Sequence, residues 1–327
     1  MKVLIASPRS GISARLQKMV SGNIQIIVPE KGSDEELISL ASDVEVIVCV
    51  HLSADVARAA KRLKLIQKTG AGVDAIPFDV LRDDVFLANT SGANPLPLAE
   101  GAVALVLALA KNIVSRHNHF PHGDNTSRRG VELRGKKAGI IGLGHTGVEV
   151  GRLLKAFEMK ILALKRHPED ASDAKFGLDF VGGPNDLDYL LQESDFVIVT
   201  VPLTPETRGM IGERELRLMK PTGYIVNIAR AAILQEEPLF KALKDGWIAG
   251  AALDVWWPPH WWSPTWNASG QPPKYEFWKL PNVIATPHCI GQTDVPSDAG
   301  LHIVAENIRR VAQGEQPANL VDKQLQY

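Results

Sequence analysis

Short apolar runs alternate with polar, helix-like segments along the first hundred residues. The runs are rich in β-branched residues and occupy 3–7, 24–28, 44–50, 63–70 and 85–90. Between two of them the chain reads Ser-Asp-Glu-Glu from Ser33, which is typical of the start of a helix. Strands that are apolar throughout and are separated by helices predict a parallel sheet covered on both faces.

A second alternating series follows in the other half of the chain. Its strand candidates are 136–144, 159–165, 196–203, 224–229, 248–256 and 282–288. Residues 99–117, which precede this series, predict one long helix that is apolar on most of its surface. We expect this helix to cross between domains or to pack on a second subunit. Residues 301–315 predict a terminal amphipathic helix.

The composition fits an ordinary globular protein of two domains. Of the 327 residues, 45% are hydrophobic and 22% are charged, and the formal net charge is -1. This balance lacks the basic excess of a nucleic-acid-binding protein. The longest apolar stretch, 102–110, is shorter than the roughly 20 residues of a membrane span. The only cysteines are Cys49 and Cys289, which excludes a disulfide framework and a CxxC metal site, so we expect a cytoplasmic protein.

A Gly-x-Gly-x-x-Gly motif at 142–147 follows a predicted strand and precedes a helical pattern. Gly142 permits the tight turn, Gly144 lets the backbone approach a pyrophosphate, and Gly147 lets helix and strand pack closely. The helix start at His145 and Thr146 offers backbone N–H groups to an anion. The context predicts a dinucleotide site, and a glycine-rich turn without a ligand is the alternative.

The next predicted strand ends in Lys165, Arg166 and His167. An NAD site normally has Asp or Glu here to accept hydrogen bonds from the ribose. Lys and Arg would instead pair with the 2′-phosphate of NADP, which a carboxylate would repel. We therefore expect NADP to be preferred over NAD, and two solvated side chains at a strand end are the alternative.

Six segments of the chain resemble the D-isomer-specific 2-hydroxyacid dehydrogenase family. They are 68–77, 89–112, 133–147, 201–230, 249–256 and 280–288, of which 201–230 and the final Thr-Pro-His are the most specific. The resemblance implies an α/β protein with two doubly wound parallel-sheet domains. A Rossmann cofactor domain at 97–290 would be inserted into a flavodoxin-like substrate domain formed by 1–96 and 291–327. It also implies a homodimer through 97–125 and an active site between the domains.

The same resemblance implies roles for individual residues. Arg230 matches the arginine that pairs with the substrate carboxylate and polarises its carbonyl, work that suits the planar fork of a guanidinium. His288 matches the acid/base that gives a proton to the carbonyl oxygen. Backbone amides in the substrate loop would grip the carboxylate, and the substrate-binding residues are Ala71, Gly72, Val73 and Asn94. Asp254 would orient the nicotinamide amide. The further cofactor contacts implied are Val201, Pro202, Thr207, Ile228, Ala229 and Gly291.

The chain departs from the family at one catalytic position. Pro259 stands where the family has a Glu that hydrogen-bonds the catalytic histidine. Glu276, Asp294 or Asp298 could replace it from elsewhere in the sequence. The family's Ala-Arg-Gly-Gly is also altered, to Ala-Arg-Ala-Ala at 229–232.

The missing Glu leaves three functions open. The first is hydride transfer between NADP(H) and a 2-oxo or 2-hydroxy acid, as in glyoxylate and hydroxypyruvate reductases. The second is hydride transfer without a general base, because formate dehydrogenases of the family share a DVW-x-P segment. The third is a dinucleotide-sensing corepressor without turnover. The presence of both Arg230 and His288 weighs against the third, because a sensor has less use for an acid/base at the nicotinamide.

Tryptophans and histidines each form one further cluster. Six of the seven tryptophans fall between Trp256 and Trp278. They predict either an aromatic wall that selects a bulky or apolar 2-oxo acid, or packing or a subunit contact. His117, His119 and His122 are interpreted as solvated or interface residues, so no metal site is expected.

Overall fold

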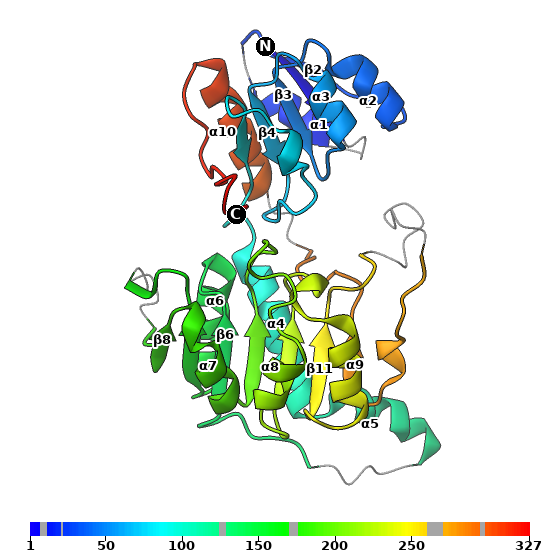
Figure 1. The fold of residues 1–327 in the computed structure, drawn as a ribbon, viewed down its shortest axis with the longest axis vertical. Coiled ribbons are helices and arrows are strands. Elements are labelled where there is room, and N and C mark those ends of the chain that lie inside the picture. Colours follow the sequence, from blue (N-terminus) through cyan, green and yellow to red (C-terminus); the bar gives the residue numbers. More distant parts are fainter. Residues whose placement is uncertain (7–11, 21, 124–128, 170–175, 260–270, 295–297) are drawn as a thin grey trace. The chain divides into compact units, whose positions relative to one another are not determined.

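The computed structural model describes residues 1–327 apart from 7–11, 21, 124–128, 170–175, 260–270 and 295–297 (Figure 1). The chain forms two compact units, and each is described by itself. Unit 1 comprises 1–94 and 295–327, and unit 2 comprises 95–294. The boundaries expected from the resemblance were residues 96 and 291.

Unit 1 contains a five-stranded parallel sheet in the order β2-β1-β3-β4-β5, which is the flavodoxin-like order. The strands are β1 (Lys2–Ile5), β2 (Gln25–Ile27), β3 (Val46–Cys49), β4 (Leu65–Lys68) and β5 (Phe86–Ala88). The helices are α1 (Ile12–Met19), α2 (Asp34–Ala41), α3 (Ala54–Ala59), η1 (Phe78–Val80) and α10 (Ala299–Ala312). Side chains of α2 and α3 pack on one face of the sheet, and those of α1 and α10 pack on the other. The expected sheet with two covered faces is confirmed.

The C-terminal segment is fastened to unit 1 by a buried pair of amides. Asn307 on α10 donates a 2.7 Å hydrogen bond to the Gln67 side chain on β4, and both residues are fully buried. The Asn307 carbonyl oxygen accepts the backbone N–H of Ala318. Buried amides are stable only when they are satisfied in this way, so the pair fixes where the chain returns to the sheet.

Unit 2 contains a seven-stranded parallel sheet in the order β12-β11-β10-β9-β6-β7-β8. Its strands are β6 (Lys137–Ile141), β7 (Lys160–Leu164), β8 (Phe180–Gly182), β9 (Phe196–Val199), β10 (Tyr224–Asn227), β11 (Gly250–Leu253) and β12 (Val283–Ala285). The expected Rossmann-type doubly wound sheet is confirmed. β8 was not predicted from the sequence, because its three residues give too short a pattern before Gly183 and Pro184.

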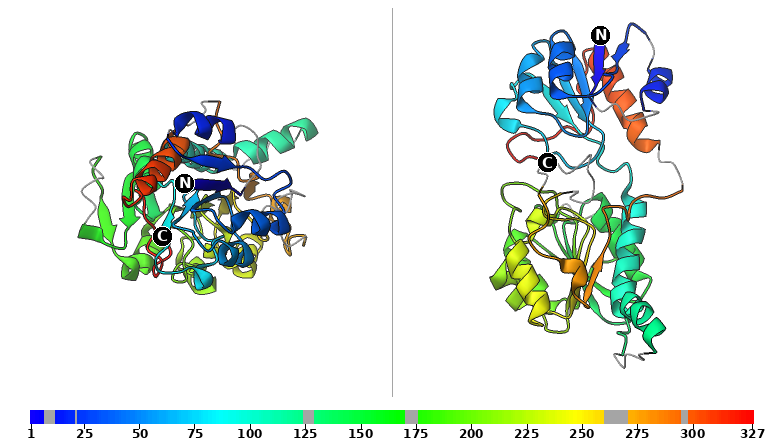
Figure 2. Two further views of the ribbon diagram at one scale, coloured as in Figure 1. Left: turned by 90° about the horizontal axis from the view of Figure 1, so that it is seen from above. Right: turned by 90° about the vertical axis from the view of Figure 1, so that its right-hand side faces the viewer.

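Helices cover both faces of this sheet as well. They are α4 (Pro95–Ala110), α5 (Ile113–His119), η2 (Phe120–His122), α6 (His145–Lys155), η4 (Pro184–Asp186), α7 (Leu187–Glu193), α8 (Glu213–Leu218), η5 (Ala231–Ile233), α9 (Glu236–Lys244) and η6 (Phe277–Lys279). α4 and α6 pack on one face, and α7, α8 and α9 pack on the other. The right-hand view of Figure 2 shows α4, in teal, across the sheet from α9, in yellow.

The prediction of one long helix at 99–117 was wrong. α4 ends at Ala110, and Asn112 adopts a left-handed conformation with φ 53° before α5 begins. Asn tolerates this conformation better than most residues, and it turns the chain by 55°. Most apolar residues of α4 are buried inside unit 2, which accounts for its composition. In the described chain no single helix is long and apolar enough to span a membrane, and only the bent α4–α5 pair reaches that length.

Candidate active site

The predicted cofactor and catalytic residues of unit 2 follow the carboxyl ends of its strands. Ligands of open parallel sheets bind at this edge, where the strand order reverses. In unit 2 the order reverses beside β6, since β7 lies on one side of it and β9 on the other. The glycine motif follows β6, Lys165 and Arg166 follow β7, and Arg230 follows β10.

The three glycines of the motif have different surroundings. Gly142 has φ +106°, and a Cβ there would lie 2.8 Å from the backbone nitrogen of Val201. A Cβ on Gly147 would lie 2.0 Å from the Gly142 carbonyl oxygen. A Cβ on Gly144, by contrast, would meet no atom within 4 Å. Two glycines are therefore required by packing, and the third faces open space at the start of α6. This arrangement fits a pyrophosphate approaching the backbone.

Thr200, at the end of β9, fixes the glycine loop and was not singled out in the sequence. Its hydroxyl donates a 2.6 Å hydrogen bond to the Gly142 carbonyl. A hydroxyl residue that ends an apolar strand is the signal that could have found it. The first residues of α6, His145 and Thr146, follow this loop.

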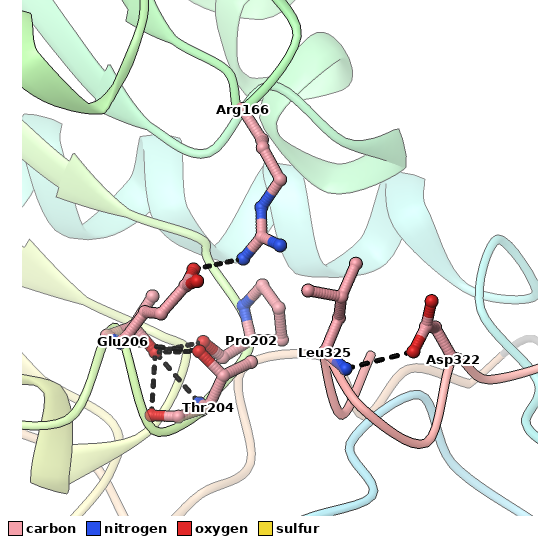
Figure 3. A network of polar contacts seen from close by, with 7 residues as sticks. Arg166, Pro202, Thr204, Glu206, Asp322 and Leu325 are labelled. Carbon is pink, nitrogen blue, oxygen red and sulfur yellow. Dashed lines mark hydrogen bonds and ion pairs between the residues drawn. The ribbon is translucent and has the colours of Figure 1, made fainter.

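The turn after β9 carries two of the expected cofactor contacts, Pro202 and Thr207, and is closed by its own hydrogen bonds (Figure 3). The Thr204 backbone N–H donates to the Thr207 hydroxyl at 2.9 Å. That hydroxyl donates to the Pro202 carbonyl at 2.7 Å. Val201 precedes the turn and is half-buried. The turn therefore has a defined shape without any ligand.

The two cations expected to bind a 2′-phosphate lie at the end of β7. The Lys165 backbone N–H donates to the Gly182 carbonyl, which continues the pairing with β8. The Arg166 guanidinium forms an ion pair with the Glu206 carboxylate from the turn after β9 (Figure 3). Nothing in the sequence pattern predicted this partner.

The buried side-chain amide of Asn227 fixes the backbone conformation at Arg230. Asn227, at the end of β10, is fully buried and donates to the Arg230 carbonyl at 3.0 Å. Its own carbonyl accepts the Ala229 N–H at 3.1 Å. The Arg230 side chain is half-buried, and its Nη1 donates to the Ala229 carbonyl at 2.8 Å. Ile228 is buried in the core beneath this segment. Asn227 is thus a positioning residue that the sequence analysis missed.

A buried carboxylate organises the turn that carries His288. Asp254 follows β11 and is 1% exposed. Its Oδ1 accepts the Thr286 hydroxyl at 2.6 Å and the Cys289 N–H at 3.0 Å. Burial raises the pKa of Asp254, and these hydrogen bonds oppose that rise. His288 lies between the two donors with φ 54°, and Gly291 follows it, half-buried.

Two of the carboxylates considered as substitutes for the missing Glu have other partners. Glu276 forms an ion pair with Lys279 at 2.7 Å. Asp298 forms an ion pair with Arg15 inside unit 1. Asp294 is exposed. The structure therefore gives Glu276 and Asp298 roles in surface ion pairs.

The described tryptophans serve packing. Trp256 is 5% exposed, packs against Phe277 and Trp278, and donates to the Thr286 carbonyl at 2.8 Å. Trp257 stacks on Phe277 with ring centroids 5.7 Å apart. These contacts favour the packing interpretation for both residues. Trp261, Trp262 and Trp266 lie outside the described residues.

The expected substrate residues belong to unit 1. Ala71 is exposed, Gly72 is half-buried and Val73 is buried. The buried amide of Asn89 donates to the Ala71 carbonyl at 2.9 Å, which fixes the loop from behind. Asn94 is the last residue of this part of unit 1 and is half-buried. Asn89 is a second positioning residue that the sequence analysis missed.

No group of three His, Cys, Asp or Glu residues suited to a metal ion occurs in the described part of the chain. His119 contacts the carbonyl of Ser115 one turn earlier in α5. Both cysteines are free.

Comparison with known proteins agrees with this geometry. Residues 103–289 match the family described as D-isomer specific 2-hydroxyacid dehydrogenase, NAD binding domain. A glyoxylate reductase of Pyrococcus furiosus is 33% identical over 98% of this chain and 94% of its own. A D-3-phosphoglycerate dehydrogenase of Archaeoglobus fulgidus is 36% identical, and the match spans 98% of this chain and 59% of that protein.

A solved structure extends the likeness to the fold. It is a D-isomer specific 2-hydroxyacid dehydrogenase of Xanthobacter autotrophicus Py2 in complex with NADPH and MES. The two chains are 23% identical and superpose with a TM-score of 0.80 over 100% of this chain and 99% of the other. Both units thus have the fold of this enzyme.

Proposed function

This chain belongs to the D-isomer specific 2-hydroxyacid dehydrogenase family and is an oxidoreductase of 2-hydroxy acids that uses a nicotinamide dinucleotide; we propose that its cofactor is NADP(H) and its substrate a small 2-oxo acid of the glyoxylate or hydroxypyruvate class. One observation carries the proposal. Arg230, Asp254 and His288 follow the three adjacent strands β10, β11 and β12, which brings a guanidinium and an imidazole to one edge of one sheet.

Arg230 holds and polarises the substrate in this proposal. Its guanidinium pairs with the substrate carboxylate through parallel N–H bonds and draws electron density from the neighbouring carbonyl. Asn227 supports this work because it fixes the backbone on which Arg230 stands. In unit 1, the loop at 71–73 is proposed to offer backbone N–H groups to a carboxylate, and Asn89 holds that loop in shape.

His288 supplies the proton. Its imidazolium gives a proton to the carbonyl oxygen as the carbon is reduced, and takes it back in the oxidation of the hydroxy acid. The left-handed turn that presents this side chain is fastened by Asp254. The reduced nicotinamide, when bound, supplies the hydride. Gly144 leaves room for its pyrophosphate.

The preference for NADP(H) is proposed from Lys165 and Arg166. Both follow β7, where an NAD enzyme has an acidic residue. A guanidinium forms strong charge-assisted hydrogen bonds with a phosphate.

A turnover assay tests the proposed reaction. Purified protein is mixed with NADPH or NADH and a panel of 2-oxo acids, and loss of the reduced nicotinamide is followed. We expect oxidation of NADPH with glyoxylate or hydroxypyruvate. Reduction of NADP⁺ by formate without activity on 2-oxo acids would favour the base-free alternative. Nucleotide binding without turnover of any substrate would favour the sensing function.

We also propose that a second copy of the chain binds at α5 and η2. Ile113 is 54% exposed and Phe120 is 84% exposed, and exposed apolar side chains in one place typically mark an interface. A groove of about 840 Å³ lies beside α5, β12 and the start of β10. None of the predicted site residues in the described chain is among those lining it. The proposed contact, around Ile113 and Phe120, is therefore narrower than the expected 97–125.

We also propose a cytoplasmic location. The two free cysteines, Cys49 and Cys289, suit this location.

A further inference from the structure

We propose that Glu206 is a specificity-determining residue that competes with the 2′-phosphate of NADP(H) for Arg166. The inference rests on the proposed function, because it concerns which nicotinamide dinucleotide the site accepts. In the free protein the Glu206 carboxylate forms an ion pair with the Arg166 guanidinium. Binding of NADP(H) replaces this carboxylate with a phosphate, whereas binding of NAD(H) leaves the ion pair in place.

The strand order places Arg166 and Glu206 on either side of the glycine motif that is expected to bind the dinucleotide. β7 and β9 are the two neighbours of β6 in the sheet. Arg166 follows β7 and Glu206 follows β9, while the glycine motif follows β6 between them. The ion pair, drawn in Figure 3, therefore joins the segments that follow the two neighbours of β6, the strand from which the dinucleotide loop starts. In this fold the ribose of the adenosine half binds at the end of the β7 position.

The backbone around Glu206 holds its carboxylate in reach of Arg166. Thr204 and Thr207, on either side of Glu206, exchange hydrogen bonds between backbone N–H and side-chain oxygen at 2.9 and 3.3 Å. The Arg208 N–H also donates to the Thr204 carbonyl at 3.0 Å. These bonds close the turn on both sides of Glu206. Its position is consequently a property of the turn rather than of a freely moving loop.

Exposure allows the carboxylate to be replaced. The Glu206 side chain is 66% exposed, whereas that of Arg166 is 27% exposed. An ion pair with one partner this exposed contributes little to folding, so its opening does not disturb the unit. Arg166 remains supported at the strand end while Glu206 turns toward solvent.

The chemistry of the two cofactors explains the discrimination. A 2′-phosphate carries nearly two negative charges and three acceptor oxygens, which suit a guanidinium but are repelled by a carboxylate. The 2′-hydroxyl of NAD is neutral and can donate a hydrogen bond to a carboxylate. Glu206, which follows β9, thus has the function of the acidic residue that is absent after β7. Arg166 favours NADP(H), Glu206 favours NAD(H), and their pairing reduces the preference between them.

The test compares Glu206→Gln with the wild type by calorimetry. Dissociation constants are measured for NADPH and NADH, and for adenosine 2′,5′-bisphosphate and 5′-AMP, which probe the ribose site without any reaction. We expect the ratio of affinities to shift toward the 2′-phosphorylated ligand by about 5- to 30-fold in both pairs, the effect of removing one nearby like charge. In the Arg166→Gln background the same substitution should give a smaller shift, because no guanidinium is then released for the phosphate.

A matched control and a second variant make the outcome decisive. Glu213→Gln removes another exposed carboxylate, which pairs with Arg217 on α8, and it should leave both ratios unchanged. Glu206→Ala should reproduce the shift if the glutamine variant is poorly folded. Unchanged ratios in both Glu206 variants, with all four ligands bound, would overturn the inference and leave the proposed function intact. Failure of NADPH and NADH to bind the wild type would overturn the proposed function and this inference with it.

Discussion

The Thr286 hydroxyl donates a 2.6 Å hydrogen bond to the buried Asp254 carboxylate and so ties the end of β12 to the end of β11. The same oxygen accepts the Cys289 N–H at 3.0 Å. His288 lies between these two donors in a left-handed conformation, which is unfavourable for a residue with a Cβ. Its backbone is held there by contacts on both sides. Asp254 therefore positions the proposed acid/base, in addition to the cofactor contact expected for it.

Substitutions of Asp254 should separate its hydrogen bonds from its charge. The Thr286 and Cys289 donors share Oδ1, so Asp254→Asn can keep these two hydrogen bonds, whereas Asp254→Ala loses them. We expect Asp254→Ala to lower the free energy of unfolding by about 1–3 kcal/mol, because buried donors lose their acceptor. Asp254→Asn should lose much less. Chemical denaturation measures both, and equal losses in the two variants would contradict this role.

The charge of Asp254 should appear in the pH dependence of the same comparison. Burial raises the pKa of Asp254 above its ordinary value of 3.8. A raised pKa means that protonation stabilises the folded state. This contribution is fully present below 3.8 and is lost as the pH rises through the folded-state value. We expect the wild type to gain stability relative to Asp254→Asn between about pH 7 and about pH 4, and a constant difference would argue against the raised pKa.

The sequence predicted the strands well because their apolar runs are continuous and are buried in the fold. It missed β8, which is short and lies at the edge of the sheet, where little burial is required of it. It also missed the break between α4 and α5, since a left-handed Asn112 leaves no hydrophobic pattern. Local patterns report burial more faithfully than they report turns.

The positioning residues could not be predicted for a different reason. Asn89, Thr200 and Asn227 each bind backbone carbonyls of a loop that carries a site residue. In the sequence each is a polar residue directly after an apolar strand. Its partner is identified only once the neighbouring loop is placed. Glu206 is the same case, because its contact with Arg166 joins residues 40 positions apart.

Two glycine substitutions should have opposite consequences. Gly144→Ala adds a Cβ that meets nothing within 4 Å, so the variant should fold as stably as the wild type. Its affinity for NADPH should nevertheless fall, because the added methyl group occupies the approach of the pyrophosphate. Gly147→Ala places a Cβ 2.0 Å from a backbone oxygen and should destabilise the protein. Thermal melting and calorimetry check both, and unchanged NADPH binding by Gly144→Ala would contradict the site.

Replacement of both cations after β7 should reverse the cofactor preference. In Lys165→Asp combined with Arg166→Ser, the 2′-phosphate loses two charge-assisted contacts, each worth roughly 1.5–3 kcal/mol. We expect at least a tenfold fall in kcat/KM for NADPH relative to NADH. Lys160→Asp, an exposed lysine at the opposite end of β7, is the matched control. An unchanged ratio in the double variant would refute the assignment of NADP(H).

The proposed dimer predicts a change in mass on removing one side chain. Phe120 is the most exposed of the large apolar side chains in the described chain, at 84%. Phe120→Asp places a charge in the proposed contact and should convert a dimer into a 35.6 kDa monomer. Phe157→Asp, at a residue 39% exposed on the same unit, is the control. Sedimentation measures both, and a wild type that sediments only as a monomer at micromolar concentration would exclude the dimer.

The proton donor predicts both a mutant phenotype and a pH profile. Reduction of a 2-oxo acid requires a protonated imidazole, so its rate should fall as the pH rises and His288 loses its proton. Pro259 stands at the position of the family's Glu, so the position of this fall tests what that residue contributes. Pro259→Glu should move this fall to higher pH, because a nearby negative charge favours the protonated form, whereas Pro259→Gln should not.

His288→Ala should lose about 10²–10⁴-fold in rate. A profile that is flat between about pH 5.5 and about pH 9, or a histidine variant with nearly full activity, would rule out proton transfer by His288 and favour hydride transfer without a general base.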